Sequence, residues 1–118
     1  MLEVAIIADD LTGAADTGVQ FCPYFLEPVL MSYNNLSSDP EGMLHSSLQA
    51  LAVYTNSRSL NAVQAQKRLQ TVSRQLLLLQ PKHIYKKVDS CIRGKVVPEV
   101  EAIMDEMGYE VSFIAPAF

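Results

Sequence analysis

Residues 4–18 read Val4-Ala5-Ile6-Ile7-Ala8-Asp9-Asp10-Leu11-Thr12-Gly13-Ala14-Ala15-Asp16-Thr17-Gly18. The first five of these residues are continuously apolar, which is typical of a parallel strand that is buried on both faces. The chain then turns polar and takes on helical spacing, so we expect a helix to begin near Leu11. This junction combines acidic side chains with glycines, and it is the first position at which the sequence suggests chemistry.

The predicted first helix is a weak one, because Gly13 and Gly18 each cost about 1 kcal/mol relative to alanine. Glycine at these positions is easier to explain if backbone or ligand must approach closely. Pro23 is expected to end the helix. Its expected apolar face consists of Leu11, Ala14, Ala15, Val19 and Cys22.

Further along the chain, apolar runs predict strands at residues 28–33, 51–55, 83–88 and 111–115. The polar stretch 34–47 carries the turn signal Asp39-Pro40-Glu41-Gly42 and is expected to be a mobile loop. Asn61 and Gln64 form a capping-box pattern at the start of a long helix that ends before Pro81. Its apolar stripe should be Ala62, Ala65, Leu69, Val72, Leu76 and Leu79.

A third helix is predicted between the last two strands, with Pro98 in its first turn and Gly108 as its C-cap. Its expected apolar face consists of Val100, Ile103, Met104 and Met107. The whole order predicts an α/β fold of the Rossmann or flavodoxin-like type, with three layers and a mostly parallel sheet of about five strands between helices on both faces.

Composition limits the class of protein. A chain of 118 residues is one domain at most, and 49% hydrophobic residues, 19% charged residues and a net charge of -4 favour a soluble globular protein. These values argue against a nucleic-acid partner, and the short apolar runs argue against a membrane span or a leader. We therefore expect a cytoplasmic protein. Cys22 and Cys91 are expected to be reduced thiols, with Cys22 packed in the core.

Polar motifs follow four of the predicted strands, and the carboxyl ends of parallel strands lie at one edge of a sheet, where ligands bind. Asp9, Asp10 and Asp16 could bind substrate hydroxyls or a metal ion. Arg58 and Arg93 could grip a carboxylate bidentately, with Ser57, Ser90 and the backbone near Gly94 as further donors. The sequence thus predicts a ligand-binding cleft at this edge of the sheet.

Four segments together resemble the amino-terminal half of the four-carbon acid sugar kinases, in order along nearly the whole chain. They are residues 8–18, Asn56-Ser57-Arg58-Ser59, Lys86-Lys87-Val88-Asp89-Ser90-Cys91-Ile92-Arg93-Gly94 and Phe113-Ile114-Ala115-Pro116-Ala117-Phe118. The resemblance implies an ATP-dependent kinase of tetronate or 3-oxo-tetronate sugar acids, with a sugar-acid-binding domain followed by a nucleotide-binding domain. Residues 1–118 would be a single domain, part of the first of these, and the nucleotide-binding domain would be absent.

By this resemblance the sugar-acid site consists of Asp9, Asp10, Thr12, Asp16, Arg58, Asp89, Ser90, Arg93 and Gly94. The general base stays open among Asp9, Asp10 and Asp16. ATP and magnesium are expected only for the full-length enzyme, so the chain alone should bind neither, hold no metal and be inactive. Its expected partners are a sugar acid and the missing domain. A second copy of the chain is also a possible partner, because the last strand would be left exposed.

The chain departs from the family pattern at several positions. The usual Asp-Ser-Thr-Leu-Arg-Gly-Asn run appears as residues 89–95, with Cys91 in place of a hydroxyl residue and Lys95 in place of an amide. Val97 replaces a common glycine, and Asn56 replaces a frequent aspartate. These changes affect which sugar acid is bound more than the class of ligand.

Other interpretations stay open. Asp10 or Thr12 could simply cap the first helix, and Asp89 and Arg93 could form a local surface ion pair. His45 and His83 are expected to be structural or solvated. The chain could also be a non-catalytic binding or regulatory remnant of the family, or a magnesium-dependent hydrolase that uses Asp9 and Asp10, which ranks lowest.

Overall fold

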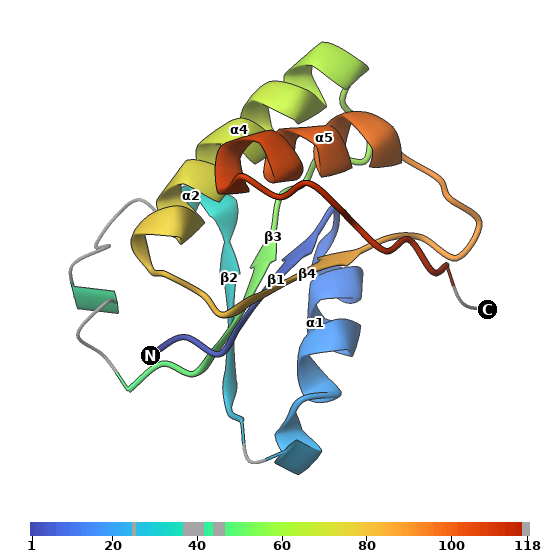
Figure 1. The fold of residues 1–118 in the computed structure, drawn as a ribbon. Helices are drawn as coiled ribbons and strands as arrows, with labels where there is room; N and C mark the ends of the chain where they lie inside the picture. The colour runs from blue at the N-terminus through green and yellow to red at the C-terminus, as the bar shows by residue number, and fades with distance from the viewer. Residues whose placement is uncertain (25, 37–41, 44–46, 117–118) are drawn as a thin grey trace.

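The structure is a computed structural model that describes residues 1–24, 26–36, 42–43 and 47–116. Its centre is a parallel sheet with the strand order β2-β3-β1-β4 (Figure 1). The strands are β1 (Val4–Ala8), β2 (Pro28–Ser32), β3 (Ala50–Tyr54) and β4 (His83–Lys87). Within one residue at their ends, these are four of the five strands that the apolar runs predict.

The register of the sheet aligns the ends of its strands. Val4 of β1 is level with Ala50 of β3 and with His83 of β4, and Ala8 is level with Tyr54 and Lys87. The segments that follow β1, β3 and β4 therefore leave the sheet at the same edge. This edge carries the polar motifs of the sequence.

Helices cover both faces of the sheet and make the predicted three layers (Figure 1). On one face α1 (Leu11–Val19) packs through Ala14 against a cluster that includes Ile6 and Ala52. On the other face α2 (Tyr33–Leu36), α4 (Ala62–Leu78) and α5 (Val96–Met107) cover a larger core that includes Ile7. Because β1 lies between two strands and two helical layers, all five of its residues are buried. The α/β class is confirmed.

The helix ends follow the sequence signals. The Asn61 side chain accepts a hydrogen bond from the Gln64 amide at 2.9 Å, and the Gln64 side chain accepts one from the Asn61 amide, so the predicted capping box is present. Gly108 ends α5 in the left-handed conformation, with φ +71°. The buried stripe of α4 is as predicted except for Ala62, which is exposed.

The predicted fifth strand is not formed. Residues 111–116 have no strand pairing, and their side chains face solvent, with Phe113 97% exposed. A cavity of about 460 Å³ lies between this segment, α5 and the outer edge of β4. Apolar residues alone do not make a strand, and residues 111–116 do not pair with the open edge of β4. The described sheet therefore has β4 as its outermost strand on this side.

The predicted face of α1 is wrong except at Ala14. Its buried residues are Ala14, Thr17 and Gly18, whereas Leu11 and Val19 are exposed. The helix ends at Val19, before a short 3-10 turn at Cys22–Tyr24. Small side chains face the sheet because α1 packs closely on it, and a Cβ atom on Gly18 would lie 3.6 Å from that of Ala52. Large apolar side chains would not fit in that space.

The two cysteines and the polar stretch 34–47 differ in part from what the sequence predicts. Cys22 and Cys91 are both free thiols, but Cys22 is exposed and not packed in the core. In the polar stretch 34–47, the first three residues belong to α2, while residues 37–41 and 44–46, including His45 and most of the turn signal, lie outside the described residues. Among the helices that the structure describes, none is long and apolar enough to cross a membrane.

Candidate functional site

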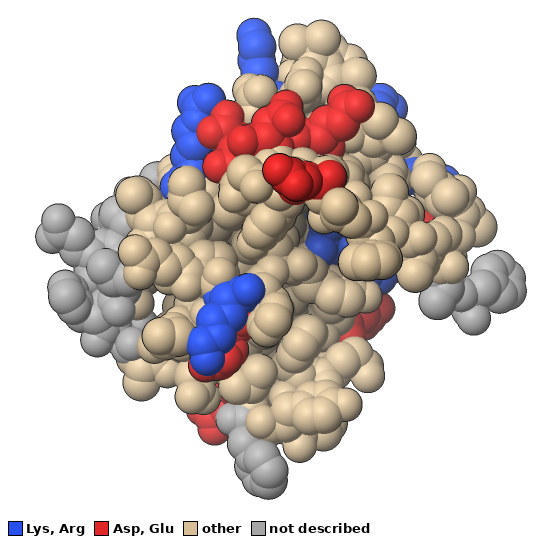
Figure 2. Space-filling model, in the orientation of Figure 1, with Lys and Arg blue, Asp and Glu red and all other residues tan. Residues whose placement is uncertain are grey.

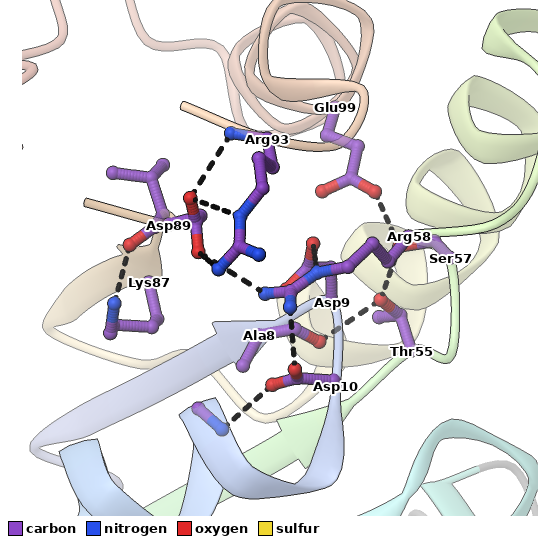
Figure 3. A network of polar contacts seen from close by, with 12 residues as sticks. Ala8, Asp9, Asp10, Thr55, Ser57, Arg58, Lys87, Asp89, Arg93 and Glu99 are labelled. Atoms are coloured by element: carbon purple, nitrogen blue, oxygen red, sulfur yellow. Dashed lines mark hydrogen bonds and ion pairs between the residues drawn. The ribbon is translucent and has the colours of Figure 1, made fainter. Parts of the chain in front are cut away.

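The ends of β1, β3 and β4 bring their polar side chains together, as the sequence predicts (Figure 3). Asp9 and Asp10 follow β1, Arg58 lies in the loop after β3, and Asp89 follows β4. The loop after β3 is fixed to β1 by its backbone, since the Ser57 amide donates to the Asp9 carbonyl at 3.1 Å. Parallel pairing of the strands therefore assembles this cluster.

Arg58 is the centre of the cluster. Its Nε donates to Asp9 Oδ2 at 3.0 Å and its Nη2 to Asp9 Oδ1 at 3.1 Å. Its Nη1 lies 3.1 Å from Asp10 Oδ2, and its Nη2 lies 3.9 Å from Asp89 Oδ1. The hydrogen bonds that Arg58 donates to the Asp9 carboxylate are the main cause that raises the pKa of the Arg58 guanidinium. One cation thus offsets the mutual repulsion of the carboxylates.

Asp89 organises the loop that leads into α5. Its Oδ2 accepts hydrogen bonds from the backbone amides of Cys91 and Arg93, and its two oxygens accept from Arg93 Nε and Nη2 at 2.9 and 2.7 Å. The hydrogen bond from the Arg93 guanidinium holds the pKa of Asp89 well below its usual range. The Arg93 side chain remains 69% exposed, so its charge stays accessible to a ligand.

The backbone of this loop is tightly constrained. Gly94 has φ +92°, and a Cβ atom there would lie 3.0 Å from Asp9 Oδ2, so only glycine fits without strain. Ile92 also has a positive φ, +58°, which is unusual for a β-branched residue. Asn56, in the loop after β3, has φ +48°, a conformation that asparagine tolerates better than most residues. Constrained backbone therefore flanks the cluster on two sides.

The alternative role of Asp10 as a helix cap is also realised. Asp10 Oδ1 accepts a hydrogen bond from the Gly13 amide at 2.7 Å, while its other oxygen faces Arg58. Capping and charge pairing therefore use different atoms of one side chain. The cap fixes the orientation in which Asp10 meets the site.

Beneath the cluster runs a chain of buried polar groups that the sequence did not point to. Thr55 Oγ1 donates to the Ala8 carbonyl at 3.0 Å and lies 2.7 Å from Ser57 Oγ. Ser57 Oγ donates in turn to Glu99 Oε1, and Glu99 Oε2 pairs with Lys86 Nζ at 2.8 Å. Ser57, predicted as a substrate contact, is fully buried, so its hydroxyl bonds within the protein.

Glu99 lies on the buried face of α5, a position that helical spacing allows but does not predict. It lies three residues after Val96 and four before Ile103, which are both buried, and it is itself only 1% exposed. The expected apolar face of this helix, which consists of Val100, Ile103, Met104 and Met107, does not include Glu99. A carboxylate on the buried face of a helix needs a cation, and Lys86 at the end of β4 is that cation.

The remaining predicted residues, Thr12, Asp16 and Ser90, take no part in the ion pairs of the cluster among the described residues, and their side chains are exposed. Lys87 donates to the Val88 carbonyl at the same edge of the sheet. Thr12 lies in the first turn of α1, just after the N-cap residue Asp10, and Asp16 lies one turn further along the helix.

Charge on the surface is distributed unevenly. Figure 2 shows acidic side chains gathered over the layer of α4 and α5, where α5 carries Glu101, Asp105 and Glu106. Within the described part of the chain, no three His, Cys, Asp or Glu residues are grouped so as to hold a metal ion. Asp9 and Asp10, the expected metal ligands of a hydrolase, face the Arg58 guanidinium instead.

The chain is similar to a known protein family and to several curated proteins. Residues 4–118 match the family model described as "Sugar-binding N-terminal domain". The chain is 33% identical over 110 residues to the D-erythronate kinase of Heliobacterium modesticaldum, covering 92% of this chain and 24% of that protein. It is 32% identical over 118 residues to the D-threonate kinase of Bordetella bronchiseptica, covering 98% of this chain and 28% of that protein.

The 3-oxo-tetronate kinase of Escherichia coli is 27% identical over 121 residues, which cover 99% of this chain and 30% of that protein. The chain therefore spans between about a quarter and a third of the length of these curated relatives.

Solved structures resemble the fold as well. Two crystal forms of a domain of unknown function (DUF1537) from Bordetella bronchiseptica, described as domain-swapped dimers with bound citrate, match with TM-scores of 0.73 and 0.75. They are 33% and 32% identical to the chain, and the matches cover 87% and 89% of this chain and 25% and 26% of theirs. Because the family match extends over nearly all residues, the chain belongs to the family of sugar-binding N-terminal domains.

Proposed function

We propose that this chain forms the sugar-acid-binding site of an ATP-dependent kinase that phosphorylates a four-carbon sugar acid of the tetronate or 3-oxo-tetronate type. The observation that carries the proposal is the meeting of Asp9, Asp10 and Asp89 with Arg58 and Arg93 at the ends of three parallel strands. The curated relatives, which are kinases of D-erythronate, D-threonate and 3-oxo-tetronate, support the substrate class.

In this proposal the two kinds of charge bind the two ends of the substrate. Arg93, exposed beside Asp89, attracts the substrate carboxylate, and the exposed Ser90 hydroxyl and the backbone at Gly94 add donors. The carboxylates of Asp9 and Asp10 accept hydrogen bonds from adjacent substrate hydroxyls. Thr12 and Asp16, on the exposed side of α1, contact the far end of the substrate. The citrate bound to the Bordetella relative is a hydroxylated carboxylic acid, which is consistent with this chemistry.

Phosphoryl transfer requires an oriented acceptor hydroxyl and a group that takes its proton. Among Asp9, Asp10 and Asp16, Asp10 joins the cluster while remaining 34% exposed, whereas the Asp9 side chain is 8% exposed and held by two bonds from Arg58. We therefore place Asp10 first as the proton acceptor. ATP and its magnesium ion, which supply the phosphoryl group and neutralise its charge, would be held by the remainder of the enzyme.

The proposal assigns residues 1–118 to a single domain, a part of the substrate-binding half of a two-domain kinase in the cytoplasm. The isolated chain should bind substrate without turnover. We also propose that it self-associates, since two solved relatives are described as domain-swapped dimers and residues 111–116 expose apolar side chains.

The test is isothermal titration of the chain with D-erythronate, D-threonate, a 3-oxo-tetronate and citrate. Arg93→Ala should weaken binding of the preferred sugar acid at least about tenfold, because a bidentate charged contact is lost. Arg74→Ala is the matched control, because Arg74 is 66% exposed and binds Glu106 bidentately on the surface away from the site. Equal affinity of the Arg93→Ala and Arg74→Ala variants, or no binding of any sugar acid by the unchanged chain, would contradict the proposal.

A further inference from the structure

The buried pair of Glu99 and Lys86 is unexpected beside the site. The Glu99 side chain is 2% exposed and that of Lys86 10% exposed, and the two charged groups meet at 2.8 Å. A buried ion pair is often no more stabilising than apolar residues of similar volume, so stability alone does not explain it. Such pairs can instead select one arrangement of the elements that they join.

Glu99 joins every strand end that carries a site residue. Through Oε1 it accepts from Ser57, whose neighbour in the chain is Arg58. Ser57 Oγ lies 2.7 Å from Thr55 Oγ1, which donates to the carbonyl of Ala8, the residue before Asp9. Through Oε2 it holds Lys86, which also donates to the Lys87 carbonyl at the end of β4. Figure 3 shows Glu99 and Ser57 on the side of the cluster from which the Arg58 side chain emerges.

The position of Glu99 on its helix supports its negative charge. It lies in the first turn of α5, where the helix dipole favours an anion, and the N-cap residue Lys95 makes no capping hydrogen bond of its own. The same helix follows directly after the loop of Asp89, Arg93 and Gly94. Glu99 is therefore connected through the backbone of α5 to the loop after β4, and through its side-chain contacts with Ser57 and Lys86 to the ends of β3 and β4.

We propose that Glu99 is a positioning residue, which fixes the loops after β1, β3 and β4 so that Arg58 faces Asp9, Asp10 and Asp89 in the geometry that binds a sugar acid. This inference rests on the proposed function for its ligand. It assigns Glu99 no contact with substrate. It assigns Ser57 the same supporting role, through its bond to Glu99.

Two variants cut the two links of Glu99 separately. Glu99→Gln keeps an oxygen that can accept from Ser57 but removes the charge that faces Lys86, and Ser57→Ala keeps the Lys86 pair but removes the hydroxyl. Glu101→Gln and Ser59→Ala are the matched controls, since both residues are exposed and lie two positions away in the same segments. Glu101→Gln removes the same formal charge from the same helix.

We expect Glu99→Gln and Ser57→Ala each to weaken D-erythronate binding about tenfold, with both controls within about twofold of the unchanged chain. A second readout needs no ligand: the NMR signal of the Arg58 Nε–H group, assigned with Arg58→Lys, should be sharp and slow to exchange in the unchanged chain and in both controls. It should be broadened or lost in Glu99→Gln and Ser57→Ala.

The outcomes separate this inference from the proposed function. If folded Glu99→Gln and Ser57→Ala proteins keep the affinity and the Arg58 signal of the unchanged chain and lose only thermal stability, Glu99 is merely structural and the inference is overturned. If the unchanged chain binds no sugar acid, the proposed function fails, and the Arg58 signal still decides whether Glu99 holds the cluster. If Glu99→Gln does not fold, Ser57→Ala decides both readouts.

Discussion

At the level of single residues, the charged side chains of the site are already paired with one another within the protein. Arg58 offsets Asp9 and Asp10, and Arg93 offsets Asp89. In the proposed complex, the sugar acid exchanges partners with these groups: its carboxylate replaces an aspartate and its hydroxyls replace an arginine. Such an exchange penalises ligands that offer only one kind of group, because a charged group would be left unpaired.

The pairing of Asp89 and Arg93 predicts a dependence of stability on pH. The pKa of Asp89 is lowered in the folded chain, so the unfolded chain binds the proton more readily, and the stabilisation is present above the ordinary value of 3.8 and is lost as the pH falls below it. Arg93→Ala should therefore lower the free energy of unfolding more at about pH 7 than at about pH 2.5. Urea denaturation at the two pH values measures both differences.

The control for this prediction is the same substitution in an Asp89→Asn background, where no carboxylate titrates. There the effect of Arg93→Ala should be small and the same at both pH values. If Arg93→Ala lowers the free energy of unfolding equally at both pH values in the chain that retains Asp89, the pairing of Asp89 and Arg93 does not cause the pH dependence.

Residue by residue, the sequence was informative where a signal is local. Asp9, Asp10, Arg58 and Asp89 could be placed together because each follows an apolar run, and parallel strands end at a common edge. The buried chain through Ser57 and Glu99 could not be predicted in the same way. It depends on how α5 is rotated against the sheet, and rotation of a helix is set by packing on both sides and not by its own pattern.

At the level of elements, α1 shows how close packing determines which residues are tolerated. Its buried face contains Ala14, Thr17 and Gly18, so the helix lies near the sheet. The large apolar residues of its sequence suggested a different face, because hydrophobic spacing alone does not report the distance between a helix and its sheet. The predicted fifth strand failed for a similar reason, because an apolar pattern does not show whether a segment pairs with the open edge of β4.

The two glycines of α1 should respond in opposite ways to alanine. At Gly18 a Cβ atom would make ordinary contacts of 3.6 to 3.8 Å, so Gly18→Ala should raise the free energy of unfolding by about 0.5–1 kcal/mol through helix propensity. At Gly13 it would lie 2.8 Å from Asp10 Oδ1, so Gly13→Ala should displace the capping carboxylate and lower stability. Chemical denaturation of the two variants measures both signs, and equal effects would contradict the packing of α1.

At the level of the whole molecule, the side of the sheet beyond β4 is incompletely covered. Phe113 and Ile114 face solvent beside the cavity that separates residues 111–115 from β4. An edge strand next to exposed apolar residues favours association between chains. The acidic surface of α5, by contrast, favours separation of copies that approach from that direction.

We expect the chain to associate in solution in a concentration-dependent way, and the Phe113→Ser, Ile114→Ser double variant to shift it toward the monomer. Light scattering coupled to size exclusion measures the molar mass at several concentrations. The control is Val63→Ser, which changes an apolar residue that is exposed on α4, away from this side. An equal shift in the control, or no association at all, would contradict the expectation.

The central position of β1 has a consequence for synthesis of the protein. β1 is synthesised before both of its neighbours in the sheet, β3 and β4, and Arg58 follows Asp9 by 49 residues. The nascent chain must keep this apolar segment from premature aggregation until β3 and then β4 arrive. Translation speed and chaperone access should therefore govern the yield of this chain more strongly than in a fold built from sequential hairpins.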